Sequence, residues 1–88
     1  MKVYILQTTW NPNETRSYNR AFGSKERMVS EYQKLLVKSN ERYLKKFNET
    51  IRCETENHSI CVYAKNQFGK EVELINWGTN YETLEVEN

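Results

Sequence analysis

The chain has 88 residues, of which 38% are hydrophobic and 28% are charged, and its net charge is +1. This composition excludes a disordered chain, and no apolar run approaches the roughly 18 residues that predict a membrane span. A chain this short buries only roughly 60% of its unfolded surface, so we expect residues 1–88 to form a single domain.

The two halves of the chain carry opposite charge. Residues 1–47 hold ten Lys and Arg against four Glu, which gives +6, whereas residues 48–88 hold three against eight, which gives −5. This polarity predicts a basic and an acidic surface that serve different partners.

The N-terminal segment predicts a β-hairpin. Residues 2–9 (KVYILQTT) are rich in β-branched and aromatic residues and read as a strand. The turn-forming stretch WNPNET follows, and RSYNRAF then alternates as a second strand.

The opening residues lack the apolar run and cleavage site of a signal peptide, which favours a cytoplasmic protein with reduced cysteines.

A helix is expected to begin after Ser24 and to run to about Phe47. Ser24 can accept a hydrogen bond from a free amide of the first turn, and Glu26 complements the positive helix start. At 100° per residue the apolar side chains form one stripe that faces the core. The stripe consists of Met28, Tyr32, Leu35, Leu36, Tyr43 and Phe47.

Four alternating runs follow the helix and predict a meander of short strands. They are TIRCETE, SICVYAK, KEVELINW and YETLEVE, and the last is the weakest. The expected fold class is α+β, with an antiparallel sheet in the order β-β-α-β-β-β(-β) and one amphipathic helix packed on one face.

The phase of the last strands predicts an acidic outer face. The inward positions are Val72, Leu74, Leu84 and Val86. The outward positions are Glu54, Glu56, Glu71, Glu73, Tyr81, Glu85 and Glu87. Such carboxylates either protect the sheet edge and keep the protein in solution or imitate nucleic-acid charge and bind a basic groove on another protein.

The basic half offers an alternative surface. Arg16, Tyr18, Arg20 and Phe22 share one face of the second strand and interleave cations with aromatic rings, as single-stranded nucleic-acid platforms do. If that face meets the helix, its aromatic residues are core and its arginines reach past them. The cations Arg27, Lys34, Lys38 and Lys45 lie opposite the apolar stripe of the helix. They form a solvated face, a contact to phosphate or to an acidic protein, or a self-contact.

Two smaller features allow further interpretations. Val37 and Leu44 are seven residues apart on the helix flank, where they either meet the sheet or form a homodimer seam. Cys53, His58 and Cys61 are residue types that zinc prefers, although the fourth ligand is missing. The competing interpretation is a pair of buried cysteines on facing strands with a solvated histidine at the turn.

Catalysis and cofactor binding find little support in the sequence. The chain has one His, no Asp and three Gly, so it lacks a phosphate-cradling loop, and we predict neither an enzyme nor a cofactor.

Residues 1–36 resemble small proteins that are common in bacteriophage genomes. The resemblance rests on MKVYIL, a polar insert, a second strand that ends in AF, and a helix that opens with SKERM. It implies an accessory protein that binds a host enzyme or defence component stoichiometrically.

Three functions are therefore expected, in order of preference. The first is a non-enzymatic protein that binds and inhibits or redirects a host protein, in host takeover or anti-defence, through Glu54, Glu71, Glu73 and Glu85 with Tyr81 as an aromatic anchor. The second is a nucleic-acid-binding module that uses the basic hairpin and helix. The third is a small-ligand binder.

Overall fold

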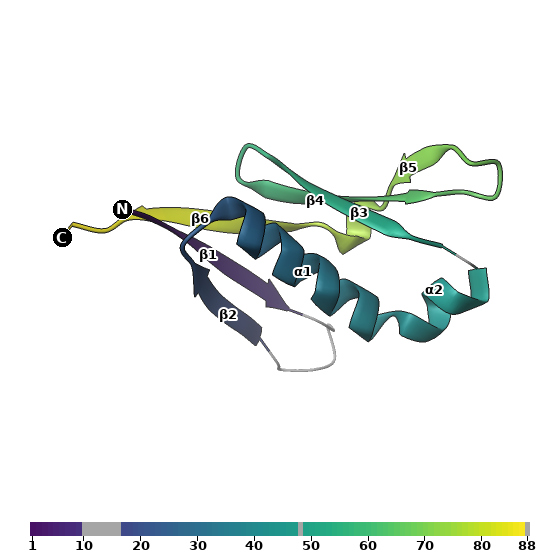
Figure 1. The fold of residues 1–88 in the computed structure, drawn as a ribbon, viewed down its shortest axis with the longest axis horizontal. Helices are drawn as coiled ribbons and strands as arrows, with labels where there is room; N and C mark the ends of the chain where they lie inside the picture. Colours follow the sequence, from purple (N-terminus) through teal and green to yellow (C-terminus); the bar gives the residue numbers. More distant parts are fainter. Residues whose placement is uncertain (10–16, 48, 88) are drawn as a thin grey trace.

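The computed structural model describes residues 1–9, 17–47 and 49–87. It is a small α+β domain with an antiparallel sheet and two α-helices (Figure 1). The elements in chain order are β1 (Lys2–Thr9), β2 (Ser17–Phe22), α1 (Lys25–Ser39), α2 (Glu41–Phe47), β3 (Ile51–Glu56), β4 (Ser59–Lys65), β5 (Glu71–Glu73), the 3-10 helix η1 (Ile75–Trp77) and β6 (Thr79–Glu85). The predicted loop WNPNET and Arg16 lie outside the described residues.

The sheet has the strand order β2-β1-β6-β4-β3, with β5 paired to the C-terminal half of β4. The two predicted hairpins β1–β2 and β3–β4 are confirmed. The last part differs from a simple meander. Residues 70–77 form only a three-residue strand and a 3-10 turn, and β6 then returns to lie between β1 and β4. It therefore joins the two hairpins into one sheet.

The predicted start of the helix is confirmed. The Arg27 backbone N–H donates to Ser24 Oγ at 3.1 Å, and Glu26 lies in the first turn. The continuous helix is not observed, because Asn40 leaves the helical conformation (φ −120°, ψ 24°) and separates α1 from α2. Its side-chain Nδ2 donates to the Leu36 carbonyl at 2.9 Å. An asparagine that bonds its own backbone in this way competes with helix continuation.

The break changes which side chains of α2 face the core. Tyr43 and Phe47, which the single-helix pattern placed inward, are about half exposed, and Leu44 is buried at 7% exposure. Val37 on α1 is 42% exposed. Val37 and Leu44 therefore do not form a common exposed seam, and the predicted homodimer contact through this pair is wrong.

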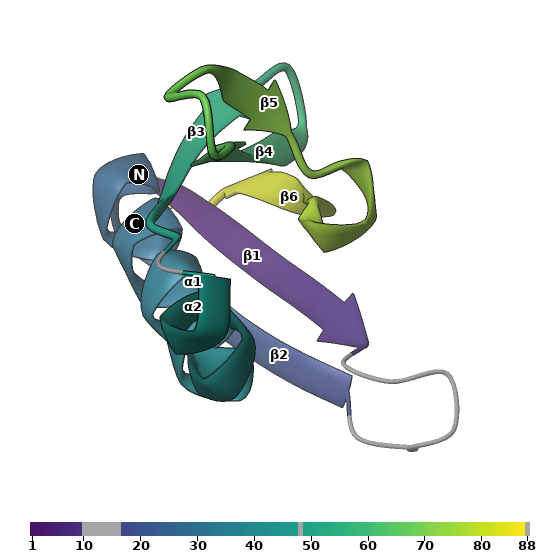
Figure 2. The same ribbon diagram turned by 90° about the vertical axis from the view of Figure 1, so that its right-hand side faces the viewer.

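Both helices lie on one side of the sheet (Figure 2). The buried side chains between the helices and the sheet form one cluster. It consists of Leu6, Phe22, Met28, Tyr32, Leu36, Leu44, Ile51, Ile60, Val62, Ala64 and Tyr81. The Tyr32 hydroxyl donates to the Trp77 carbonyl at 2.5 Å and ties α1 to η1. Burial of this apolar surface is the main stabilising contribution to the fold.

The predicted inward phase of β6 is wrong. Tyr81 pairs with the fully buried Leu6 and is itself only 4% exposed, whereas Leu84 and Val86 are 54% and 36% exposed. Since side chains alternate along a strand, burying Tyr81 places Leu84 on the opposite face. Val72, expected inward, is also exposed, while Leu74 packs against the core as predicted.

Gly78 lies at the corner between η1 and β6, where the chain passes close to β4. A Cβ at this position would lie 2.9 Å from the Ile60 carbonyl oxygen, whereas a Cβ at Gly23 would meet nothing within 4 Å. We expect Gly78→Ala to lower the free energy of unfolding by about 1–3 kcal/mol, because a backbone atom must shift. Gly23→Ala is the matched control and should be close to neutral. Urea unfolding measures both, and equal losses in the two variants would contradict this explanation.

Candidate functional site

A groove of about 830 Å³ lies between α1 and the edge of β3. Its helix side contains Val29, Gln33 and Val37, which are spaced four residues apart and therefore share one side of α1. Its strand side contains Glu54 and Thr55. We call this feature the α1–β3 groove.

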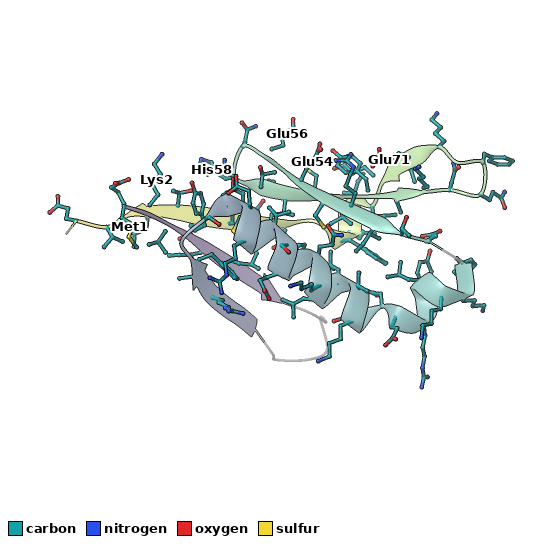
Figure 3. The ribbon with its side chains drawn as sticks, in the orientation of Figure 1. Met1, Lys2, Glu54, Glu56, His58 and Glu71 are labelled. Atoms are coloured by element: carbon teal, nitrogen blue, oxygen red, sulfur yellow. The ribbon has the colours of Figure 1, made fainter. Side chains whose placement is uncertain are left out.

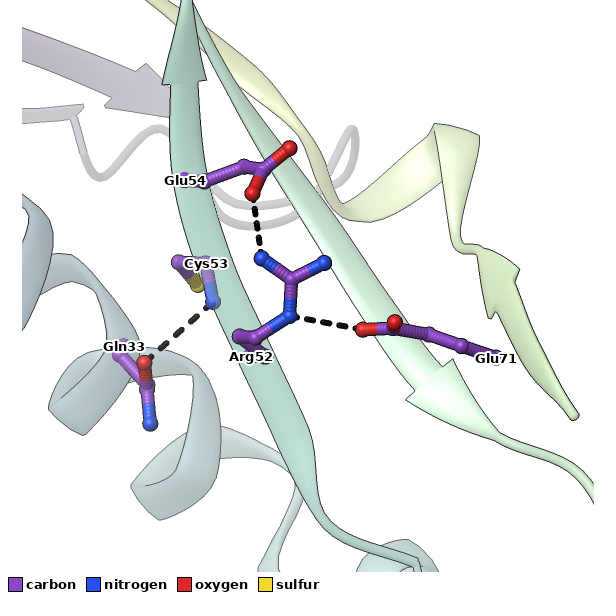
Figure 4. A network of polar contacts seen from close by, with 5 residues as sticks. All are labelled: Gln33, Arg52, Cys53, Glu54 and Glu71. Carbon is purple, nitrogen blue, oxygen red and sulfur yellow. Dashed lines mark hydrogen bonds and ion pairs between the residues drawn. The ribbon is translucent and has the colours of Figure 1, made fainter. Parts of the chain in front are cut away.

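The strand that borders the groove has an open edge. β3 is the last strand of the sheet, and within residues 1–9, 17–47 and 49–87 it pairs only with β4. The Cys53 backbone N–H points away from β4 and donates to Gln33 Oε1 at 3.4 Å (Figure 4). Because backbone groups alternate in direction along a strand, those of Ile51 and Thr55 face the same open side.

The apolar part of the groove comes from α1. Val29 is partly buried and packs against the core, while Val37 is exposed. The two valines stand beside the buried stripe of Met28, Tyr32 and Leu36, so the helix presents a second, shallower apolar stripe toward the edge of β3.

Charged side chains surround this apolar stripe. They are Lys25, Lys34, Lys38, Glu26, Glu41 and Glu54. Glu41 forms an i,i+4 ion pair of 3.2 Å with Lys45. Glu54 accepts a hydrogen bond from the Arg52 guanidinium.

Arg52 organises the outer face of β3, β4 and β5. Its guanidinium bonds Glu54 and also donates from Nε to Glu71 Oε1 at 2.7 Å (Figure 4), and it stacks 4.7 Å from the centre of the Tyr63 ring. The hydrogen bond from Arg52 lowers the pKa of Glu71, and the two carboxylates raise the pKa of Arg52. On this face Glu54 and Glu71 are therefore held in an ion-pair network and are not free carboxylates.

The predicted acidic surface is divided by the structure. By strand register Glu54, Glu71 and Glu73 share the face that points away from the helices. Glu85 lies on the other face of the sheet, on the side of Tyr81, and accepts a 3.1 Å bond from the amino group of Met1. Met1 and Glu71 lie far apart along the molecule (Figure 3).

Tyr81 is not the aromatic anchor that the sequence suggested. Its ring is in the core, and its hydroxyl donates to the Asn57 carbonyl at 2.8 Å. Of the remaining outward glutamates, Glu56 shares the outer face with Glu54 near the β3–β4 turn, whereas Glu87 follows the end of β6.

Within the part of the chain that the structure describes, the predicted nucleic-acid-binding residues do not form one platform. Arg16 and the side chain of Tyr18 lie outside that part. Phe22 is buried and Arg20 stacks 5.0 Å from its ring centre, which fits the interpretation of this face as core with an arginine that reaches past it.

The cations that the same prediction placed on α1 lie among acidic side chains. Glu31 lies 3.7 Å from Arg20 and 3.8 Å from Lys34. Lys34 and Lys38 line the α1–β3 groove, whereas Arg27 does not.

The two cysteines point to opposite faces of the sheet. Cys53 pairs with the buried Val62, and Cys61 pairs with the outward Glu54. The residues Cys53, His58 and Cys61 therefore do not converge on a zinc ion, and the paired-cysteine interpretation is also wrong. Burial raises the pKa of the Cys53 thiol to about 11, which keeps it protonated at neutral pH.

Sequence reasoning missed the groove itself. The helical spacing of Val29, Gln33 and Val37 was visible, but its meaning depends on which strand lies at the sheet edge. Local sequence patterns do not specify that order, because it is decided by the pairing of β6.

Comparison with protein-family models, curated proteins and solved structures gives no match for this chain. Among the described residues, no helix has the length and apolar character needed to cross a membrane.

The Arg52 network predicts a pH dependence. Because Arg52 lowers the folded-state pKa of Glu71, the stabilisation from this contact is present at neutral pH and is lost as the pH falls through that pKa. In Arg52→Gln we expect the Glu71 carboxyl to titrate at a higher pH, and the difference in Tm from the parent protein to shrink on acidification. Carbon-detected NMR titration and thermal unfolding at several pH values measure these effects.

Arg42→Gln is the control for this titration, since Arg42 is an exposed residue of α2 outside the network. An unchanged Glu71 midpoint in Arg52→Gln would contradict the assigned cause.

Proposed function

We propose that this protein is a non-enzymatic binding module that takes up an extended segment of another protein in the α1–β3 groove. The observation that carries the proposal is the open edge of β3, whose outward backbone groups border a groove with an apolar helix wall. An added strand obtains affinity from backbone hydrogen bonds and specificity from alternate side chains that meet the neighbouring wall.

Gln33 supports this mode of binding. Its side-chain oxygen accepts from the Cys53 N–H, which is the position that the carbonyl of an added strand would take. At 3.4 Å this bond is long, so exchanging it for a strand carbonyl costs little.

The dimensions of the groove also suit a short strand. The 15 residues of α1 span about 22 Å at about 1.5 Å per residue. An extended chain rises about 3.3 Å per residue, so about six or seven residues fit along the helix.

The proposal keeps the protein-binding function expected from the sequence but relocates the surface. Of the predicted set, Glu54 belongs to both the outer face and the groove, whereas Glu71, Glu73, Tyr81 and Glu85 do not line the groove. That the partner is a host protein, and that the chain is a phage accessory protein, stay predictions from the resemblance of residues 1–36.

A blocking variant tests the proposal. Ser30 is an exposed α1 residue that lines the groove, and Ser30→Trp should fill it. Peptides selected from a random extended library on the immobilised protein should bind the parent chain and lose at least tenfold in affinity for Ser30→Trp. Fluorescence anisotropy gives the affinities, and NMR shifts of the Cys53 and Thr55 amides locate the site.

Arg27→Trp is the matched control, because Arg27 is an exposed α1 residue outside the groove. It should bind the same peptides as the parent chain does. If both tryptophan variants bind equally well, or if the Cys53 and Thr55 amides do not shift, strand addition in this groove is excluded.

A further inference from the structure

The charges around the α1–β3 groove are unequally partnered. Two of its three glutamates are engaged outside the groove: Glu41 pairs with Lys45, and Glu54 bonds Arg52. Glu26 lies in the first turn of α1, where the positive end of the helix compensates it.

The lysines toward the other end of α1 have weaker partners. Lys38 lies in the last turn, where the negative end of the helix compensates it in part, as the positive end does for Glu26. Lys34 lies 3.8 Å from Glu31, but that carboxylate also faces Arg20 at 3.7 Å and is therefore shared between two cations. Lys38 has no ion-pair partner among residues 1–9, 17–47 and 49–87. The ammonium groups of Lys34 and Lys38, which line the groove, can therefore still pair with a carboxylate of a bound segment.

The apolar contacts have a spacing that matches an extended chain. Val29 and Val37 are eight residues apart, about 12 Å along a helix. Two side chains on the same face of a strand and four residues apart are about 13 Å apart. An added strand can therefore place an apolar side chain opposite each valine, with one more helix-facing position between them.

That middle position lies beside Gln33 and within reach of the lysines. The alternate positions of the strand face the other way, next to Arg52 and Glu54 on the outer face of β3. A carboxylate there adjoins the Arg52 network, in which two carboxylates face one guanidinium, and the excess negative charge repels it. A carboxylate at the middle position is on the helix side of the strand, where Lys34 and Lys38 line the groove.

We infer that the groove recognises an extended segment whose helix-facing side chains read apolar, acidic, apolar at alternate positions, with the carboxylate bound by Lys34 and Lys38. This inference rests on the proposed strand addition, and it specifies the chemical class of the partner. The apolar side chains provide burial against Val29 and Val37, and the carboxylate sets the register.

Four labelled peptides test the inference. Three have the sequence Thr-Val-Thr-X-Thr-Val-Thr with X as Glu, Gln or Lys, and the fourth has Gln at X and Glu moved to the preceding position. We expect the peptide with Glu at X to bind about threefold to tenfold more tightly than the Gln peptide, since two exposed ion pairs contribute modestly. The Lys peptide should bind more weakly than the Gln peptide, and the shifted Glu peptide should show no gain.

The protein variants assign the preference to particular lysines. The double variant Lys34→Gln/Lys38→Gln should lose the preference for Glu at X and keep the parent Tm, because both side chains are exposed. Arg27→Gln removes a cation from the same helix outside the groove and should keep the preference.

The outcomes separate the two proposals. If the Gln and Lys peptides bind as tightly as the Glu peptide and shift the Cys53 and Thr55 amides, the partner class is wrong and strand addition stands. If the double variant retains the preference, the assignment to Lys34 and Lys38 is overturned. If no peptide shifts these amides at millimolar concentration, both proposals fail.

Discussion

The double pairing of β6 is the constraint on which the rest of the structure depends. Its first residues pair with β4 and its later residues with β1, so one strand joins two hairpins that would otherwise be independent. A two-stranded hairpin is only marginally stable by itself, and the joined sheet offers the wide apolar face against which α1 packs. The same pairing fixes β3 as an outer strand of the sheet.

An open strand edge can pair with other chains by mistake, and it can also serve as a binding site. It exposes unpaired backbone groups that invite pairing with another chain, and proteins commonly guard such edges. In this fold the edge of β3 is protected by the Gln33 side chain, which accepts a hydrogen bond from the Cys53 N–H. The charged side chains of Arg52 and Glu54 protect it on the outer face. α1 lies along one side of this edge, where its side chains line the groove.

The features set by local chemistry were predictable from the sequence. Ser24 caps α1, and Met28, Tyr32 and Leu36 face the sheet, because capping and helical periodicity depend on a few neighbouring residues. The break at Asn40 was missed, since the side-chain bond to Leu36 competes with a helix that the apolar pattern alone would continue. Missing that break also placed Tyr43 and Phe47 in the core and left Leu44 outside it.

The candidate site was less predictable than the fold, and β6 shows why. Tyr81 lies on one face of the predicted last strand, and Leu84 and Val86 lie on the other. Both faces therefore contain apolar residues, and the sequence pattern alone does not show which face is buried. Pairing with Leu6 buries Tyr81 and exposes the others. The sequence by itself determined the strands of the two hairpins, the start and cap of α1, and the charge difference between the halves. Only the tertiary structure decided strand order, the face of each residue in β6 and the position of the groove, because these depend on pairing between residues far apart in the chain.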